Sequence, residues 1–241
     1  MELFCEYEEV MADTDKAGKV LRTIRERMGE DAAVMIARAA ACPDKDKADL
    51  IYRMIVLGFH LKDGHRITGM LGDPVMQRMF ELGRKAGNIA MRYIEIIRFQ
   101  ELDSGALLAV IDPEADVLAL IASHFSNRLP LENWMIYDRR RQKAVIHPAG
   151  KGWFLVEEVD ERSVLEAEMS HEEAWYGELW KCFFKTLTIE ARVNQKLQTS
   201  LIPLKYRDFM KEFQNESLRE DCEKCQNKET KQEYEKQISQ E

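Results

Sequence analysis

The sequence contains few cysteines and no long apolar run, and both absences exclude whole classes of protein. Its five cysteines are an odd number scattered over 241 residues, which fits reduced thiols better than a disulfide scaffold. No stretch approaches the roughly 20 apolar residues that a membrane-spanning helix needs. The first residues also lack the basic region and apolar run of a secretory signal. We therefore expect a cytoplasmic protein without a membrane partner.

Motifs for common cofactors are also missing. The glycines between positions 64 and 87 fit neither a P-loop nor a dinucleotide fingerprint. No group of three cysteines is spaced to ligate an iron–sulfur centre. Cys222 and Cys225 have the spacing of half a zinc site, but no cysteine or histidine follows to complete a set of four ligands. We therefore expect no bound cofactor and no metal.

Apolar residues make up 45% of the chain, enough to build a substantial core in one large domain or two small lobes. Their spacing predicts an α+β fold in a single domain over residues 1–213. We expect a helical part at 1–92, an antiparallel β-sheet of about five strands interrupted by a helix at 93–160, and helices again at 170–213. Within the sheet region the expected strands are 93–101, 106–111, 134–137, 143–147 and 153–159, with a helix at 117–125.

One long C-terminal helix is expected to start at Ser170. Ser170 and Glu173 have the spacing of a capping box, in which each side chain satisfies a backbone donor of the first turn. An apolar stripe recurs every three or four residues and predicts burial against the core: Leu179, Trp180, Phe183, Phe184, Leu187 and Ala191. A separate row, Thr186, Glu190, Asn194 and Gln198, either holds a ligand or fastens a loop.

Residues 214–241 differ in composition from the rest of the chain. This tail is rich in charged residues and nearly free of aliphatic ones. Because it cannot bury enough apolar surface to offset the entropy lost on ordering, we expect a disordered or fraying tail.

The net charge of −8 is unevenly distributed along the sequence. Residues 154–180 hold nine acidic side chains and one basic one. Residues 128–153 hold six basic and two acidic side chains, and residues 181–213 hold seven basic and three acidic ones. Two readings stay open. The two basic segments form a surface for phosphates, or they pair internally with the acidic segment.

Four residues of the central region are candidates for nucleic-acid chemistry. His124, Arg128, Asp138 and Arg140 together offer an acid, a base and phosphate clamps. Structural roles compete with this hypothesis, because His124 can cap the end of a helix and Asp138 can close an Asx turn. The tryptophans Trp134, Trp153, Trp175 and Trp180 likewise either stack on an extruded base or pack with each other.

Two groups of short motifs recur at separated positions. The C-terminal group comprises Trp175-Tyr176, Leu179-Trp180, Phe183-Phe184, Ile189-Glu190-x-Arg192-x-Asn194, Gln198, Pro203-x-Lys205-Tyr206 and Met210-x-Glu212-Phe213. The central group comprises Arg98-Phe99-Gln100-Glu101, Asp112-Pro113, His124-Phe125 with Arg128, and Trp134-x-Ile136-x-Asp138 with Arg140 or Arg141. From about residue 3 to Phe213 these motifs resemble a family of bacterial DNA-metabolism and DNA-repair proteins.

That resemblance implies a biological process, DNA repair or DNA modification, rather than a particular reaction. The family is a domain of unknown function that is associated with a radical-SAM protein and is joined in some proteins to a uracil-DNA glycosylase domain. The resemblance therefore implies three partners: DNA, a radical-SAM protein and a uracil-DNA glycosylase. The candidate nucleic-acid-binding residues are Arg98, Arg128, Arg140, Arg141, Arg192, Asn194 and Lys205. The candidate catalytic residues are His124, Asp138 and Glu190.

Three hypotheses for the function follow. The leading one is a DNA-repair or DNA-modification protein that binds nucleic acid and works with a radical-SAM partner. The second is a stand-alone hydrolase or lyase that acts on damaged nucleotides through His124, Asp138 or Glu190. The third is a non-catalytic protein adaptor. Salt-dependent DNA binding separates the first two from the third, because phosphate contacts release counterions.

Overall fold

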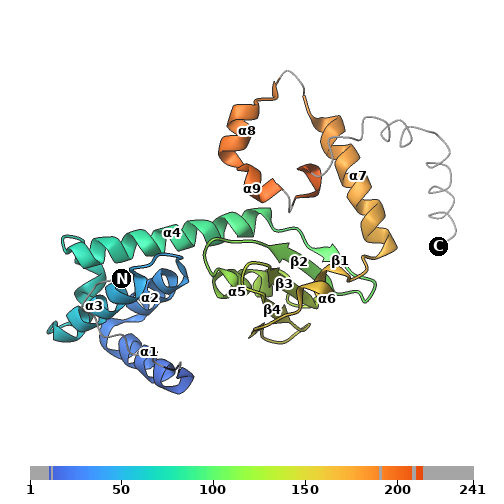
Figure 1. Cartoon of the computed structure of the whole chain (residues 1–241). Helices are drawn as coiled ribbons and strands as arrows, with labels where there is room; N and C mark the ends of the chain where they lie inside the picture. Colours follow the sequence, from blue (N-terminus) through green and yellow to red (C-terminus); the bar gives the residue numbers. More distant parts are fainter. Residues whose placement is uncertain (1–10, 12, 190–191, 208–209, 214–241) are drawn as a thin grey trace, which may run out of the picture. The chain divides into compact units, whose positions relative to one another are not determined.

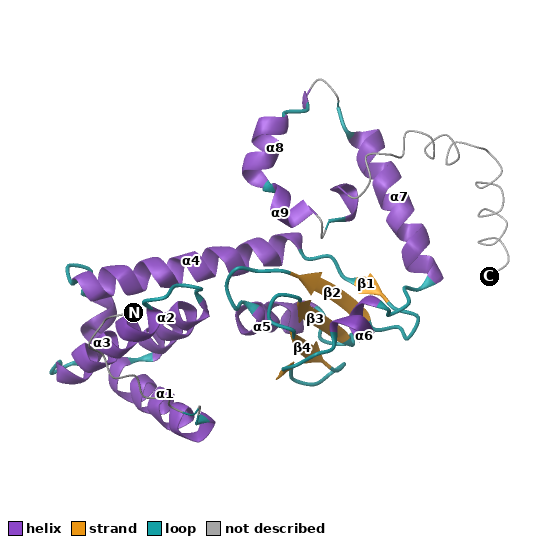
Figure 2. Ribbon diagram, in the orientation of Figure 1, coloured by secondary structure: helices purple, strands orange, loops and turns teal. Residues whose placement is uncertain are grey.

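The computed structural model describes residue 11 and residues 13–189, 192–207 and 210–213 (Figure 1). The expected tail, with Cys222 and Cys225, lies outside the described residues. The described residues divide into two units. The first unit runs to Ala90 and also includes Glu114–Leu120, and the second comprises Met91–Pro113 and the residues from Ile121 onward. The chain has the predicted α+β fold, which Figure 2 shows by element type.

Helices make up the first unit, and Asp73 caps one of them. These are α1 (Thr14–Met28), α2 (Glu30–Ala41), α3 (Lys47–His60), the 3₁₀ helix η1 (Gly64–Gly69) and the first part of α4 (Pro74–Ile96). Asp73 accepts hydrogen bonds from the N–H groups of Val75 at 2.8 Å and Met76 at 3.2 Å, and so caps the start of α4. Gly29, with φ of +90°, ends α1 and leads directly into α2.

The core of the first unit is built largely from methionine, isoleucine and alanine. Ile24, Met28, Ile36 and Met54 are among its buried residues. Gly64 lies where η1 crosses the end of α1, and a Cβ atom at this position would come within 2.4 Å of the carbonyl oxygen of Arg27. Only a glycine lets these two backbones approach so closely.

The second unit contains a five-stranded sheet in the order β1-β2-β3-β4-β5. Its strands are β1 (Gln100–Glu101), β2 (Leu107–Ile111), β3 (Trp134–Asp138), β4 (Lys143–His147) and β5 (Phe154–Val156). The pairings are antiparallel except that of β2 with β3, which is parallel. The helix between them, α5 (Leu118–Arg128), supplies the crossover that a parallel pair requires. The sheet is therefore mostly antiparallel, and this one parallel pair departs from the expected antiparallel pairing.

The expected strand at 93–101 is also wrong for most of its length. Helix α4 continues to Ile96, and β1 keeps only Gln100 and Glu101. Tyr93, Ile96 and Ile97 are all buried at helical spacing, so burial on the helix outweighs the β-propensity of the isoleucines.

Aromatic side chains anchor the segment after α4 to one face of the sheet. The ring of Phe99 lies edge-on to Phe125 of α5, with centroids 5.3 Å apart, and 6.1 Å from Trp134. His147 is buried and stacks on Trp134 at 4.9 Å. This cluster fixes the backbone of Arg98 and Phe99 beside the sheet.

The C-terminal part of the second unit is a series of helices rather than one long helix. It comprises α6 (Glu161–Leu165), α7 (His171–Leu187), α8 (Gln195–Leu201), α9 (Leu204–Arg207) and the 3₁₀ helix η3 (Lys211–Phe213). The predicted single helix from Ser170 is wrong beyond Leu187, because Asn194 caps a new helix by accepting from the N–H of Leu197 at 3.0 Å. Among the residues that the model describes, no helix is both long and apolar enough to cross a membrane.

The apolar stripe of α7 is exposed, which contradicts the prediction that it packs on the core. Trp180 is 44% exposed and Phe183 is 52% exposed. Leu179, Phe184 and Leu187 are exposed as well. The periodicity correctly predicted an amphipathic helix, but it could not predict which surface covers the apolar face.

The close approach at Gly64 provides a stability test with a matched control. We expect Gly64→Ala to lower the free energy of unfolding by about 1–3 kcal/mol, because the new methyl group meets a backbone carbonyl that cannot move aside. Gly69 belongs to the same 3₁₀ helix and has open space around it, so Gly69→Ala should change stability far less. Chemical denaturation of both variants measures the difference, and equal effects would contradict the packing at Gly64.

Candidate functional site

The basic segment at 139–141 is held by internal partners. Arg139 pairs with Glu161 at 2.9 Å, and Arg140 binds both oxygens of Asp112 at 2.8 and 3.2 Å. The hydrogen bond from Arg140 lowers the pKa of the Asp112 carboxyl. Glu161 belongs to the acidic segment 154–180, so the contact of Arg139 favours pairing with that segment. Arg140 also pairs internally, but with Asp112, which lies outside that segment.

Asp138 lies fully buried at the end of β3 and closes the turn that follows. It accepts the backbone N–H groups of Arg140 at 3.0 Å and Arg141 at 3.2 Å, and pairs with the guanidinium of Arg141 at 2.9 Å. Arg141 also donates to the carbonyl oxygen of Pro113 at 3.0 Å. Burial raises the pKa of Asp138, and its donors offset part of this effect. The carboxylate therefore performs the Asx-turn role.

His124 and Arg128 lie on the exposed side of α5, one turn apart. The His124 ring lies edge-on to Phe125, 5.1 Å between centroids. Within the described part of the chain, no hydrogen bond or ion pair joins His124 to Asp138. The structure thus places His124 at the surface and Asp138 in the interior.

The remaining candidates are distributed over the C-terminal helices. Glu190 lies outside the described residues, and Arg192 is exposed in the turn before α8. Asn194 caps α8, while the Lys205 ammonium lies 5.1 Å from the centroid of the Tyr206 ring. The Thr186 hydroxyl donates to the carbonyl oxygen of Cys182 at 2.8 Å. Because α7 ends at Leu187, these polar residues do not form one continuous row.

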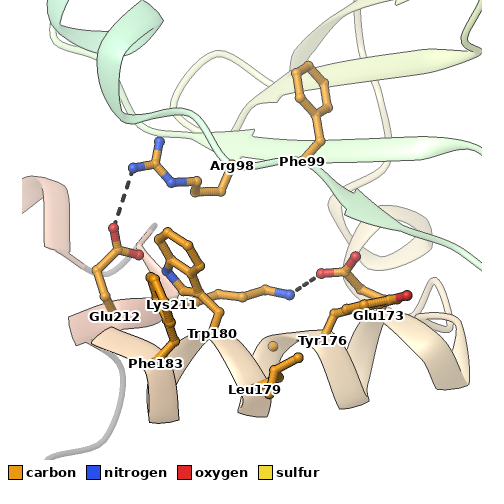
Figure 3. A pocket seen from close by; sticks show the side chains of 10 residues that line it. Arg98, Phe99, Glu173, Tyr176, Leu179, Trp180, Phe183, Lys211 and Glu212 are labelled. Atoms are coloured by element: carbon orange, nitrogen blue, oxygen red, sulfur yellow. Dashed lines mark hydrogen bonds and ion pairs between the residues drawn. The ribbon is translucent and has the colours of Figure 1, made fainter. Parts of the chain in front are cut away.

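A cavity of about 660 Å³ lies between α7, η3 and the segment that links α4 to β1. Its lining is mostly apolar, with four charged side chains (Figure 3). The lining residues are Arg98, Phe99, Glu173, Tyr176, Gly177, Leu179, Trp180, Phe183, Lys211 and Glu212. Both groups of sequence motifs contribute to this lining, so segments far apart in the sequence meet at one place. We take the cavity as the candidate functional site.

Glu173 joins three segments at one end of the cavity. The Ser170 hydroxyl caps α7 by accepting from the N–H of Glu173 at 3.0 Å, which confirms half of the predicted capping box. The Glu173 carboxylate does not return to the cap. One oxygen accepts from the N–H of Glu101 at 3.3 Å, and the other accepts from Lys211.

Gly177 leaves room for the pair between Glu173 and Lys211. The Lys211 side chain runs past α7 at this buried glycine, and a Cβ atom at 177 would lie 3.2 Å from Lys211 Nζ. Figure 3 shows the lysine extending along the helix to reach the carboxylate. A helix-weakening glycine is therefore explained by the side chain that it lets pass.

Glu212 faces the other end of the cavity and has one unused oxygen. Its side chain is 7% exposed, and one oxygen accepts from Arg98 at 3.4 Å. The other oxygen, Oε2, is buried and has no hydrogen-bond partner among the described residues. A buried acceptor without a partner costs about 1–3 kcal/mol, so this oxygen is suited to receive a donor from a ligand.

The sequence did not reveal Gly177 or Lys211 as residues of this site, and it did not reveal that Glu212 acts as an acceptor. Glu173 was expected only in the capping box, and Glu212 only within a motif. The motifs Arg98-Phe99 and Met210-x-Glu212-Phe213 were the available signal, because both contribute to the cavity. Among the described residues, no group of three or more histidine, cysteine and acidic side chains is placed to hold a metal ion.

The contrast between Asp138 and Asp112 gives a second test of stability. Asp138→Ala should lower the free energy of unfolding by about 3–5 kcal/mol, because it leaves Arg141 and two backbone donors without their buried acceptor. Asp112→Ala breaks a pair that is largely exposed, so the cost should be about 1 kcal/mol or less. Urea denaturation compares the two, and a small effect at Asp138 would argue against a structural role.

Comparison with known proteins places the chain in a family. A family model described as a domain of unknown function, DUF4130, matches residues 45–212, which is more than two thirds of the chain. No significant match is found among curated proteins or among solved structures. The matched residues include every residue that lines the cavity. The chain belongs to the DUF4130 family of uncharacterised domains.

Proposed function

We propose that this protein binds nucleic acid in DNA repair or DNA modification, and that its C-terminal helices contact single-stranded or locally unpaired DNA. The observation that carries the proposal is the exposure of aromatic side chains on α7 close in sequence to exposed cations at the start of α8. Proteins that bind single strands combine aromatic stacking platforms with a basic groove along the backbone.

The aromatic residues of α7 are available to stack on bases. Trp175, Tyr176, Trp180, Phe183 and Phe184 are all exposed on a helix of 17 residues. Isolated exposed apolar residues are ordinary, but a contiguous set of this kind marks an interaction surface. Every base has a π-face, so these rings can bind unstacked bases of any sequence.

The cations of the C-terminal segment suit phosphates better than those at 139–141. Arg192 and Lys196 are exposed, and neither makes an ion pair with a described residue. Arg139 and Arg140, in contrast, have carboxylate partners within 2.9 Å. We therefore assign phosphate binding mainly to the C-terminal segment, and to Arg128, which is also exposed.

The setting and the partners of this function come from the family resemblance of the sequence motifs. It supports a radical-SAM protein as the partner that supplies the chemistry and a uracil-DNA glycosylase as a further one. A stand-alone hydrolase or lyase that uses His124, Asp138 or Glu190 is less favoured, because Asp138 is committed to its turn.

A protein adaptor is the second candidate function. Aliphatic residues that stack poorly on bases are also exposed on and around α8, among them Val193, Leu197 and Leu201. They offer a surface for a protein partner, and binding of the radical-SAM protein in the absence of DNA would support this candidate. Co-purification with and without DNA separates an adaptor from a protein that meets its partner on DNA.

The cation assignment predicts how salt affects DNA binding. Arg192→Ala and Lys196→Ala should each weaken binding to single-stranded DNA whatever its sequence, and each should reduce the log–log salt slope by about 0.7. Arg139→Ala is the control, because Glu161 already neutralises that charge. Fluorescence anisotropy at several salt concentrations measures the slopes. Equal slopes for wild type and both variants would remove these residues from the interface.

Base stacking on the aromatic residues of α7 predicts a separate loss of DNA affinity that is not electrostatic. Trp180→Ala should weaken binding by about 1–3 kcal/mol, the usual contribution of one stacked base. Leu187→Ala removes another exposed apolar side chain of α7 that cannot stack, so it should bind as the wild type does. Because both side chains are exposed, neither variant should melt much earlier. Equal affinity of Trp180→Ala and wild type would contradict stacking on α7.

A further inference from the structure

We propose that the cavity beside α7 holds one unstacked nucleobase that carries an exocyclic amino group, and that Glu212 accepts a hydrogen bond from this group. The inference rests on the proposed function, because it names the part of the nucleic acid that the cavity selects. Three observations carry it: the charge balance of the cavity, its aromatic wall, and the unused oxygen of Glu212.

The charges in the cavity favour a neutral ligand. Two cations, Arg98 and Lys211, face two carboxylates, Glu212 and Glu173, and each cation is paired with one carboxylate. A cage of aromatic rings with free carboxylates would select a cationic ligand, but here both carboxylates are neutralised. A nucleobase is neutral at pH 7. The volume of about 660 Å³ lies in the range of about 300–1,000 Å³ that is typical of small-ligand sites.

The wall of the cavity favours a flat ligand. Trp180 and Phe183 are stacked with ring centroids 5.8 Å apart and their planes inclined by 29°. In Figure 3 both rings project from α7 on the side where Arg98 and Glu212 lie. They remain 44% and 52% exposed, so a planar aromatic ligand can cover them and gain stacking energy.

Glu212 supplies the polar contact that a base edge needs. Oε1 is bound to Arg98, whereas Oε2 is buried and no residue that the structure describes donates a hydrogen bond to it. Arg98 is itself held by the carbonyl oxygens of Glu95 at 3.1 Å and Ile97 at 3.2 Å, so the carboxylate is supported by a fixed cation. An ionised carboxylate only accepts hydrogen bonds, and Oε2 therefore requires an N–H donor.

This requirement distinguishes between the bases. Cytosine and adenine present an amino group as a donor, and glutamate and aspartate accept from that of cytosine in known base contacts. Thymine and uracil carry a carbonyl oxygen where cytosine carries its amino group, and their ring N–H lies between two carbonyl oxygens. An acceptor that faces such an edge meets another acceptor, and a buried mismatch of this kind is costly. The cavity should therefore favour cytosine or adenine over thymine and uracil.

Base preference in single-stranded oligonucleotides tests the inference. The probes are thymine oligonucleotides of about ten nucleotides, within the usual site size, with or without one central cytosine or adenine. Wild-type protein should bind the substituted oligonucleotides at least about tenfold more tightly by anisotropy, as expected for a hydrogen bond to a charged group. Glu212→Gln can donate through its amide, so it should lose this preference and gain affinity for thymine.

The control is Glu178→Gln, which changes an exposed carboxylate of α7 that pairs with Lys181 and does not line the cavity. It should keep the wild-type preference. Equal binding of all oligonucleotides by the wild type overturns the base selection but leaves the proposed function standing. Binding of none of them overturns both. If Glu212→Gln does not fold, the order of the oligonucleotides by wild-type affinity still tests the inference. An equal loss of affinity of Glu212→Gln for every oligonucleotide would show that Glu212 has only a structural role.

Discussion

The ion pair between Glu173 and Lys211 is the interaction on which the candidate site depends. It connects α7 to η3, and the hydrogen bond from the Glu101 N–H to the same carboxylate connects α7 to β1. Gly177 leaves room for the lysine as it crosses α7. A partly buried pair of this kind adds little net stability over an apolar contact, so its main effect is to fix the position of α7. The cavity exists because that position is fixed.

The placement of α7 explains why its apolar face is exposed. Its hydrogen bonds and ion pair with β1 and η3 come from polar groups at Ser170 and Glu173. Of the stripe, Phe184 lies edge-on to Phe213 of η3 at 6.2 Å and is still exposed, as are Trp180 and Phe183. Most of the stripe is thus left for another molecule. Exposed aromatic rings are unfavourable in water, and nucleobases and apolar protein surfaces are both able to cover them. Exposed cations and a cavity with balanced charge favour bases as the ligand.

Local signals in the sequence predicted much of the fold. Ser170 marked the start of α7, and Lys143–His147 was predicted as a strand with the bounds that β4 has. Local interactions determine such features. The parallel pairing of β2 with β3 is a property of chain topology, although the intervening helix was a signal for it. The exposure of α7 and the crossing of Lys211 at Gly177 depend on contacts between distant segments, which periodicity does not encode.

The central claim is that nucleic acid engages the α7 cavity, and cross-linking tests it most directly. A single-stranded oligonucleotide with a photoreactive base would be irradiated with the protein, and the modified peptides would be identified by mass spectrometry. The account predicts cross-links at Tyr176, Trp180 or Phe183, which line the cavity. Cross-links confined to α1–α3, or the absence of any protein–DNA cross-link at low salt, would contradict it.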